Sequence, residues 1–222
     1  MVKTLDDITF NVIDWADRDD EDIEEDDEQE SGYVIEAYGK TQDKKSVYLK
    51  INGFTPYFFV EIPKTWKDTH VKRFIDFIRN KTYGKFQNSL ITYDVVKKHR
   101  LYGFTAGKRF KFVRLVFNTN EGMKKYKWIF NSKHKIPGLD NTFKEYKAYE
   151  SGFPPLLRFM HIQNINASGW LKINKKKYTK IPKRGFNTDI AIEAKWTDVE
   201  GYENSKVADI SILSYEIGRA HV

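Results

Sequence analysis

The sequence has no cysteine, which excludes disulfides, thiolate zinc sites and thiol nucleophiles together. It also lacks any apolar run near the roughly 18 residues that a membrane helix needs. Acidic residues stand among its first ten positions, where a secretory signal would be hydrophobic. These absences predict an intracellular protein without a membrane span.

Motifs of several enzyme classes are missing too. The sequence contains neither HExxH nor GxxxxGK[ST] nor GxSxG, so no zinc-hydrolase, P-loop or acyl-transfer site is recognisable. The five histidines are scattered at positions 70, 99, 134, 161 and 221, without a pair at ligand spacing. The residues by themselves therefore predict no cofactor for this chain and favour a binding function over an autonomous enzyme.

Aromatic residues, by contrast, are plentiful. The 222 residues include 16 Phe, 13 Tyr and 5 Trp, and 31% of the residues are charged. This length suffices for one large domain or two small ones, and the apolar content excludes disorder of the whole chain.

The net charge of +7 combines two opposite populations. Residues 17–30 read DRDDEDIEEDDEQE and carry a charge of −10, so the rest of the chain carries +17. We expect residues 17–31 to form an acidic flexible loop, because like charges at this density repel and bury little. Mimicry of DNA or capture of a basic partner is the alternative role for this loop. The basic remainder attracts polyanions, of which nucleic acid is the commonest large one.

Hydrophobic periodicity predicts an α+β fold. Val71, Phe74, Ile75 and Ile78 recur at the spacing of one helical face, which predicts an amphipathic helix over residues 68–80 packed on a sheet. The other expected helices cover residues 121–130, 142–150 and the start of 153–164. The expected strands cover residues 8–15, 33–40, 46–53, 55–63, 90–99, 109–118, 168–174, 188–199 and 207–215. The first four strands suggest an antiparallel meander or small barrel, and residues 175–184 a basic loop.

Basic residues alternate with aromatic ones in KKHRLYGF (97–104), GKRFKFVR (107–114) and KKYKW (124–128). Phosphates need cations and unpaired bases stack on flat apolar faces, so this mixture fits single-stranded nucleic acid. The candidate binding residues are Lys97, Lys98, Arg100, Tyr102, Lys108, Arg109, Lys111 and Arg114. The alternative is that Phe110, Phe112 and Phe117 belong to the core and the lysines only solvate the strand edges.

Four segments resemble a known family in their order along the chain. They are INGFTPYFFVEIP (51–63), RLYGFTAGKRFKFVRLVF (100–117), FPPLLRFMHIQNINASGWLKI (153–173) and ADISILSYE (208–216). Together they resemble the N-terminal region of family B DNA polymerases, above all the delta-type replicative branch that includes polymerases of large DNA viruses. The resemblance implies a small OB-like β-barrel, an RNA-recognition-like α/β portion and the first strand of a ribonuclease H-like exonuclease domain. It further implies a non-catalytic region that helps to support the single-stranded template.

The resemblance also implies a role for the position of Glu216. In that family the last strand continues into Asp-Ile-Glu, the first exonuclease motif, whose carboxylates lie on one side of the strand and share divalent metal ions. Here Glu216 stands at the Asp position, Ile217 matches and Gly218 replaces the Glu. No catalytic residue is therefore intact, and Glu216 is the single candidate metal ligand. Mg²⁺ is implied for the parent enzyme and no cofactor for the fragment.

The last six residues, IGRAHV, look like the in-frame translation of a sequencing adapter. We therefore expect residues 217–222 to be a non-native tail on a truncated gene fragment; a genuine glutamate and a polar tail are the alternative. On this view residues 1–205 form the polymerase N-terminal domain and residues 206–216 begin the 3′–5′ exonuclease domain.

The leading hypothesis is a fragment, not itself catalytic, of a DNA-directed DNA polymerase whose parent protein also has 3′–5′ exonuclease activity. Its partners would be the single-stranded DNA template and the missing exonuclease and polymerase domains of the same chain. It would act in the nucleus or at a viral replication site in the host cytoplasm. One alternative is a freestanding single-strand nucleic-acid-binding module. Another is an adaptor whose acidic loop binds a basic partner.

Overall fold

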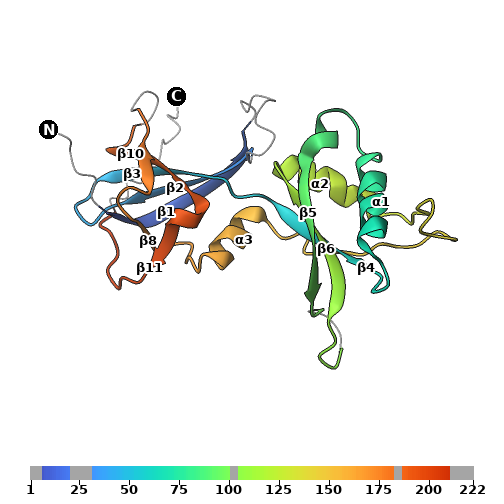
Figure 1. The fold of residues 1–222 in the computed structure, drawn as a ribbon. Coiled ribbons are helices and arrows are strands. Elements are labelled where there is room, and N and C mark those ends of the chain that lie inside the picture. Colours follow the sequence, from blue (N-terminus) through green and yellow to red (C-terminus); the bar gives the residue numbers. More distant parts are fainter. Residues whose placement is uncertain (1–6, 21–31, 101–104, 183–186, 211–222) are drawn as a thin grey trace, which may run out of the picture.

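Two sheets, each with its own hydrophobic core, organise the chain into two lobes (Figure 1). The computed structural model describes residues 7–20, 32–100, 105–182 and 187–210. We call the part around the seven-stranded sheet the first lobe and the part around the four-stranded sheet the second lobe. Helices and strands occur together in both, as an α+β fold requires.

The first lobe is built from segments at both ends of the chain. Its elements are β1 (Ile8–Asp19), β2 (Tyr33–Lys40), β3 (Ser46–Asn52), β8 (Trp170–Ile173), β9 (Tyr178–Lys180), β10 (Ile190–Lys195), β11 (Val199–Tyr202), helix α3 (Pro155–Ile162) and the 3₁₀ helix η2 (Trp196–Asp198). The strands lie in the order β11-β8-β1-β2-β3-β10-β9. The predicted antiparallel meander is confirmed for β1, β2 and β3. Its fourth expected strand, over residues 55–63, belongs to the other sheet, and β10 joins β3 in parallel instead.

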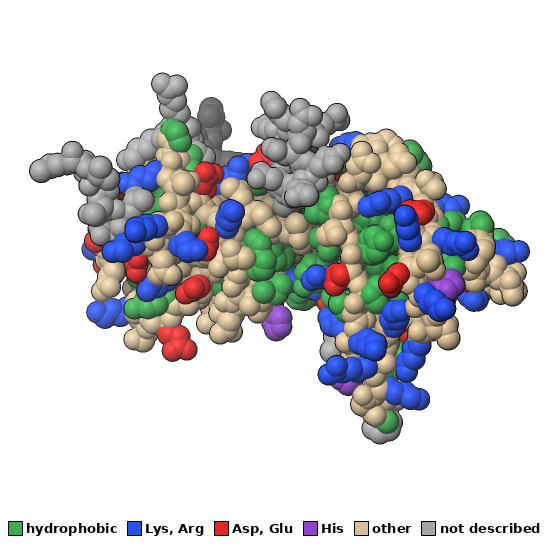
Figure 2. Space-filling view, viewed as in Figure 1, with side chains coloured by type: hydrophobic (Ala, Val, Ile, Leu, Met, Phe, Trp, Pro, Cys, Tyr) green, Lys and Arg blue, Asp and Glu red, His purple; other side chains and the backbone are tan. Residues whose placement is uncertain are grey.

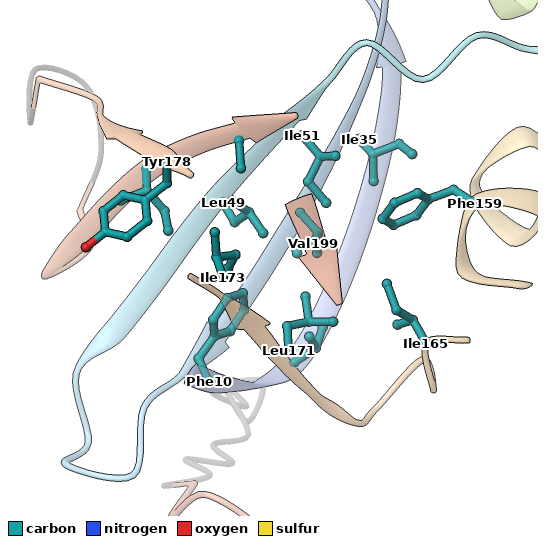
Figure 3. Packing of buried hydrophobic residues seen from close by; sticks show 14 of the residues in the cluster. Phe10, Ile35, Leu49, Ile51, Phe159, Ile165, Leu171, Ile173, Tyr178 and Val199 are labelled. Carbon is teal, nitrogen blue, oxygen red and sulfur yellow. The ribbon is translucent and has the colours of Figure 1, made fainter. Parts of the chain in front are cut away.

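The seven-stranded sheet curls around its core (Figure 3). Tyr178 on β9 and Val199 on β11 come from opposite ends of the strand order, yet both belong to one buried cluster with Leu49 of β3. Phe159 of α3 is fully buried in the same cluster. The helix therefore covers part of the core that the curled sheet surrounds.

The second lobe has the split βαβ arrangement. Its elements are β4 (Tyr57–Ile62), α1 (Asp68–Arg79), the 3₁₀ helix η1 (Gly84–Ser89), β5 (Leu90–Lys98), β6 (Phe110–Phe117), α2 (Asn120–Ile129) and β7 (Ala148–Tyr149). The sheet order is β5-β6-β4-β7, with every pair antiparallel. A strand–helix–strand–strand–helix–strand chain in this order places both helices on one face.

The helices α1 and α2 cover that face by burying alternate strand residues. Phe58 and Val60 of β4 and Val113 of β6 share a cluster with Phe74 of α1 and Tyr126 of α2. The helices predicted over residues 68–80 and 121–130 are thereby confirmed. The opposite face of the sheet carries the remaining alternate residues and is free of these helices.

The prediction of a helix over residues 142–150 is wrong. This segment is extended: Lys144 forms a bridge with His134, and Tyr149 pairs with Phe59 of β4. Tyr146 lies between them, buried, and its hydroxyl donates a hydrogen bond to Asp140. The backbone groups at the edge of β4 are satisfied by this segment, which outweighs its helical propensity.

Other boundaries also differ from the expectation. β1 continues to Asp19, so the first residues of the expected acidic loop pair with β2; residues 21–31 lie outside the described residues. The expected basic loop contains β9, which pairs with β10. The strand expected over 188–199 is divided by η2, and residues 207–210 of the last expected strand are not in a strand.

One side chain connects the two lobes through the N-terminus of α2. Asp19, at the end of β1, accepts hydrogen bonds from the backbone N–H groups of Asn120 at 2.7 Å and Glu121 at 2.8 Å. The first N–H groups of a helix have no partner within it, so a carboxylate there is stabilising. No helix among the described residues is long and apolar enough to span a membrane.

Candidate nucleic-acid interface

The strands β5 and β6 form a hairpin that projects from the second lobe, and basic side chains gather on it (Figures 1 and 2). Of the eight candidate residues, seven lie on or next to this hairpin: Lys97, Lys98, Arg100, Lys108, Arg109, Lys111 and Arg114. The eighth, Tyr102, is outside the described residues. Pairing of the two strands brings together cations that are up to 17 positions apart in the sequence.

The seven cations do not share one face. Lys97 is paired with Lys111 on the side of the sheet that bears the helices, whereas Lys98 and Arg114 lie on the open side. Lys108 and Arg109 are exposed near the end of the hairpin. The hairpin therefore presents positive charge around its whole circumference rather than in one flat patch.

Aromatic rings cover the open face of the four-stranded sheet. Phe59 of β4, Phe112 of β6 and Tyr149 of β7 form edge-to-face contacts, with ring centroids 6.5 Å and 5.3 Å from Phe112. Phe59 and Phe112 are 5% and 3% exposed, so they are not available for stacking with a base. The core interpretation is thus correct for Phe112 and Phe117, while Phe110 is half-buried.

Cationic side chains lie over aromatic rings on the open face of this sheet. The Lys98 ammonium is 3.8 Å from the centroid of Phe59, and the Arg100 guanidinium is 4.0 Å from that of Phe110. Arg114 is 5.4 Å from the ring of Tyr57. Cation–π contacts of this kind hold long side chains in place. The ammonium and guanidinium groups are therefore positioned at the surface above an aromatic layer.

Carboxylates pair with three of the cations. Arg100 donates to Glu61 through Nε at 2.9 Å, and the hydrogen bonds of this pair raise the pKa of Arg100. Tyr149 also donates to Glu61, and burial together with this hydrogen bond raises the pKa of Tyr149. Lys98 pairs with Glu150 and Arg114 with Asp94. By contrast, Lys108 and Arg109 have no ion pair with another described residue.

No metal centre is formed by the described residues. They contain no group of three or more His, Asp or Glu side chains that could hold a metal ion. Glu216, the candidate ligand, lies outside the described residues. What the described arrangement offers is positive charge on a projecting hairpin, which is suited to phosphate contacts.

Comparison with known proteins identifies the family of this chain. The family model "DNA polymerase family B, exonuclease domain" matches residues 146–221. A DNA polymerase of Acanthamoeba polyphaga mimivirus is 37% identical over 219 residues, which are 94% of this chain and 12% of the viral protein. The DNA polymerase delta catalytic subunit of Dictyostelium discoideum is 25% identical over 197 residues, 83% of this chain and 18% of that protein. The chain belongs to the family B DNA polymerases. It corresponds to their N-terminal region and spans less than a fifth of the length of these two relatives.

The fold of this polymerase region agrees with a solved family member. The family B DNA polymerase of the hyperthermophilic archaeon Pyrobaculum calidifontis superposes with a TM-score of 0.57 at 14% identity, covering 89% of this chain and 21% of the archaeal one. The resemblance seen in four sequence segments is thus confirmed, both at the level of family and of fold.

Sequence reasoning overlooked one cation of the polymerase region. Arg158, in α3 of the first lobe, is 6% exposed and lies 4.2 Å from the ring centroid of Tyr57 in the second lobe. It donates to the side chain of Glu150 and, at 3.1 Å, to its backbone carbonyl. The signal was weak, because FPPLLRFMHI contains a single charged residue with no basic neighbours. Its position at the junction between the lobes depends on tertiary structure.

Proposed function

We propose that this region binds the single-stranded DNA template along the β5–β6 hairpin and supports it for a polymerase that continues in the same protein. The observation that carries the proposal is the gathering of basic side chains on one projecting hairpin. Contacts to phosphates are made by Lys and Arg and carry no sequence information, so binding should be weak, sequence-tolerant and salt-dependent.

We infer the activity of the parent protein from the names of the relatives. DNA polymerases are the named functions of the viral and delta-type proteins, so we infer that the parent protein is a DNA-directed DNA polymerase with 3′–5′ exonuclease activity that uses Mg²⁺ and acts where DNA is replicated inside a cell. We assign residues 1–205 to its N-terminal domain, with an OB-like first lobe and an RNA-recognition-like second lobe, and residues 206–216 to the first strand of a ribonuclease H-like exonuclease domain. A freestanding binding module has no observation in its favour beyond charge and aromatic content.

The hairpin is tested with two charge-reversed variants. Lys108→Glu with Arg109→Glu changes exposed cations on the hairpin, and Lys180→Glu with Lys195→Glu changes exposed lysines of the first lobe as a matched control. We expect the hairpin variant to bind a fluorescent dT20 strand at least about tenfold more weakly, with the slope of log K against log salt reduced by about 0.7 for each phosphate that is no longer neutralised. Equal affinities of the two variants would overturn the proposed binding site.

A further inference from the structure

A pocket lies where β4 ends and β6 begins, next to the loop end of the β5–β6 hairpin. Its volume is about 360 Å³, and the end of β4, Arg100, the start of β6 and the segment that enters β7 line it. Pockets of a few hundred Å³ are of the size that holds a small ligand or one unit of a polymer.

Positive charge predominates in this pocket. Lys64, Arg100, Lys111, Lys144 and Lys147 line it, against the two carboxylates of Glu61 and Glu145. A lining with this excess of cations repels a metal ion and attracts an anion. The ligand class that fits is therefore a phosphate or another compact anion.

The carboxylate of Glu61 does not cancel this attraction. It is already bound by the Arg100 guanidinium and by the Tyr149 hydroxyl, which donates to it at 2.9 Å. Lys64 and Lys147, in contrast, have no ion pair with another described residue; their ammonium groups lie 6.0 Å and 5.4 Å from the ring centroids of Phe110 and Tyr149. These two lysines keep their charge available to an incoming ligand.

An aromatic surface accompanies the charge. The half-buried ring of Phe110 lines the pocket, with the Arg100 guanidinium 4.0 Å from its centroid. Unpaired bases stack on aromatic rings and on guanidinium planes, whereas a phosphate needs cations alone. Charge and a flat surface in one pocket favour a nucleotide over a simple inorganic anion.

We propose that this pocket binds one nucleotide of a single DNA strand, with its phosphate between Lys64 and Lys147 and its base against the Arg100–Phe110 pair. The inference rests on the proposed function, since the strand would reach the pocket from the exposed cations at the loop end of the hairpin, next to which the pocket lies. It adds a discrete nucleotide site to a surface that otherwise offers only distributed charge.

The test uses the 222-residue chain, three probes and two variants. The probes are thymidine, its 5′-monophosphate and a fluorescent dT20 strand, and binding is measured by anisotropy for dT20 and by backbone amide shifts for the two small probes. Lys64→Ala with Lys147→Ala removes the unpaired cations, and Lys180→Ala with Lys195→Ala is the matched control. Unchanged thermal melting shows that each variant is folded.

We expect the pocket variant to bind dT20 at least about fivefold more weakly than the control, with a salt slope smaller by about 0.7 because one phosphate is no longer neutralised. Thymidine monophosphate should shift the amides of residues 61, 62, 64 and 144–149, and thymidine should not. Unchanged dT20 affinity in the pocket variant would overturn the inference; if the monophosphate still shifts those amides, the pocket serves free nucleotides instead. The hairpin variant tests the proposed function separately. If the hairpin variant binds dT20 weakly and the pocket variant binds it normally, the nucleotide pocket is rejected and the proposed function is retained.

Discussion

Asp140 shows how one buried carboxylate can determine the course of an irregular segment. It is 6% exposed and accepts hydrogen bonds from the Tyr146 hydroxyl and, at 3.1 Å, from the Ile136 backbone N–H, while the Lys144 ammonium lies 3.0 Å away. Burial alone would raise the pKa of Asp140, but these hydrogen bonds and the Lys144 charge outweigh it and lower the pKa. The charged form is therefore favoured by folding.

We expect Asp140→Asn to lower the free energy of unfolding by about 2 kcal/mol at neutral pH, because the hydrogen bonds to a charged group are removed and an amide then faces the Lys144 ammonium. A group whose pKa is depressed in the folded state stabilises the protein above its ordinary pKa, here 3.8, and loses that effect below it. The difference in the free energy of unfolding between wild type and Asp140→Asn should thus shrink as the pH falls below about 4.

Urea denaturation at several pH values measures this difference. Asp76→Asn is the control, since Asp76 is exposed on α1 and its change should stay within about 0.5 kcal/mol. A constant difference between wild type and Asp140→Asn from neutral pH to well below the ordinary pKa of the carboxyl would contradict the linkage argument.

At the scale of elements, β1 and β2 approach each other too closely for any side chain at Gly39. A Cβ atom there would lie 2.3 Å from the backbone oxygen of Asn11 and 2.5 Å from the ring of Phe10, which is fully buried. Gly39→Ala should therefore separate the strands and destabilise the protein by about 3 kcal/mol.

Gly152→Ala is the matched control for Gly39→Ala. Its nearest neighbour is the flexible end of Lys127 at 3.7 Å, so we expect a neutral effect or a gain of about 0.5 kcal/mol from reduced freedom of the unfolded chain. Circular dichroism during thermal unfolding gives the melting temperatures of Gly39→Ala and Gly152→Ala for comparison. Equal melting temperatures would show that the strands can shift to admit the methyl group.

Sequence reasoning succeeded for elements whose own residues specify them. α1 has four apolar residues on one helical face, and β4 and β6 have strong strand composition, so all three were predicted. It failed for residues 142–150, because their extended form depends on the unpaired edge of β4 and on Asp140. The hairpin cations were proposed as binding residues because they alternate with aromatic residues, and this stays a prediction. Lys64 and Lys147 line the proposed pocket only because strand pairing brings their segments together.

At the scale of the whole molecule, the family resemblance implied a barrel and an α/β portion, but not which segments form each. The first lobe combines residues 8–52 with residues 155–202. Four segments of the chain carried a family resemblance because local motifs persist in order. Contacts between the lobes join residues that are far apart in the sequence, so local motifs do not predict them. The contact of Asp19 with the N-terminus of α2 is an example.

Asp19 provides the last prediction, because it connects the two lobes at the start of the acidic segment. Asp19→Ala removes both hydrogen bonds to the α2 N-terminus and should cost about 1 kcal/mol, the usual effect of removing a helix cap. We expect faster hydrogen exchange at the amides of residues 120–122 and a lower melting temperature for the second lobe than for the first. Asp14→Ala, whose carboxylate accepts only from the adjacent Trp15 N–H among the described residues, is the control and should change neither. If both variants leave exchange in α2 unchanged, the lobes are held together without Asp19, through contacts such as that of Arg158 with Tyr57.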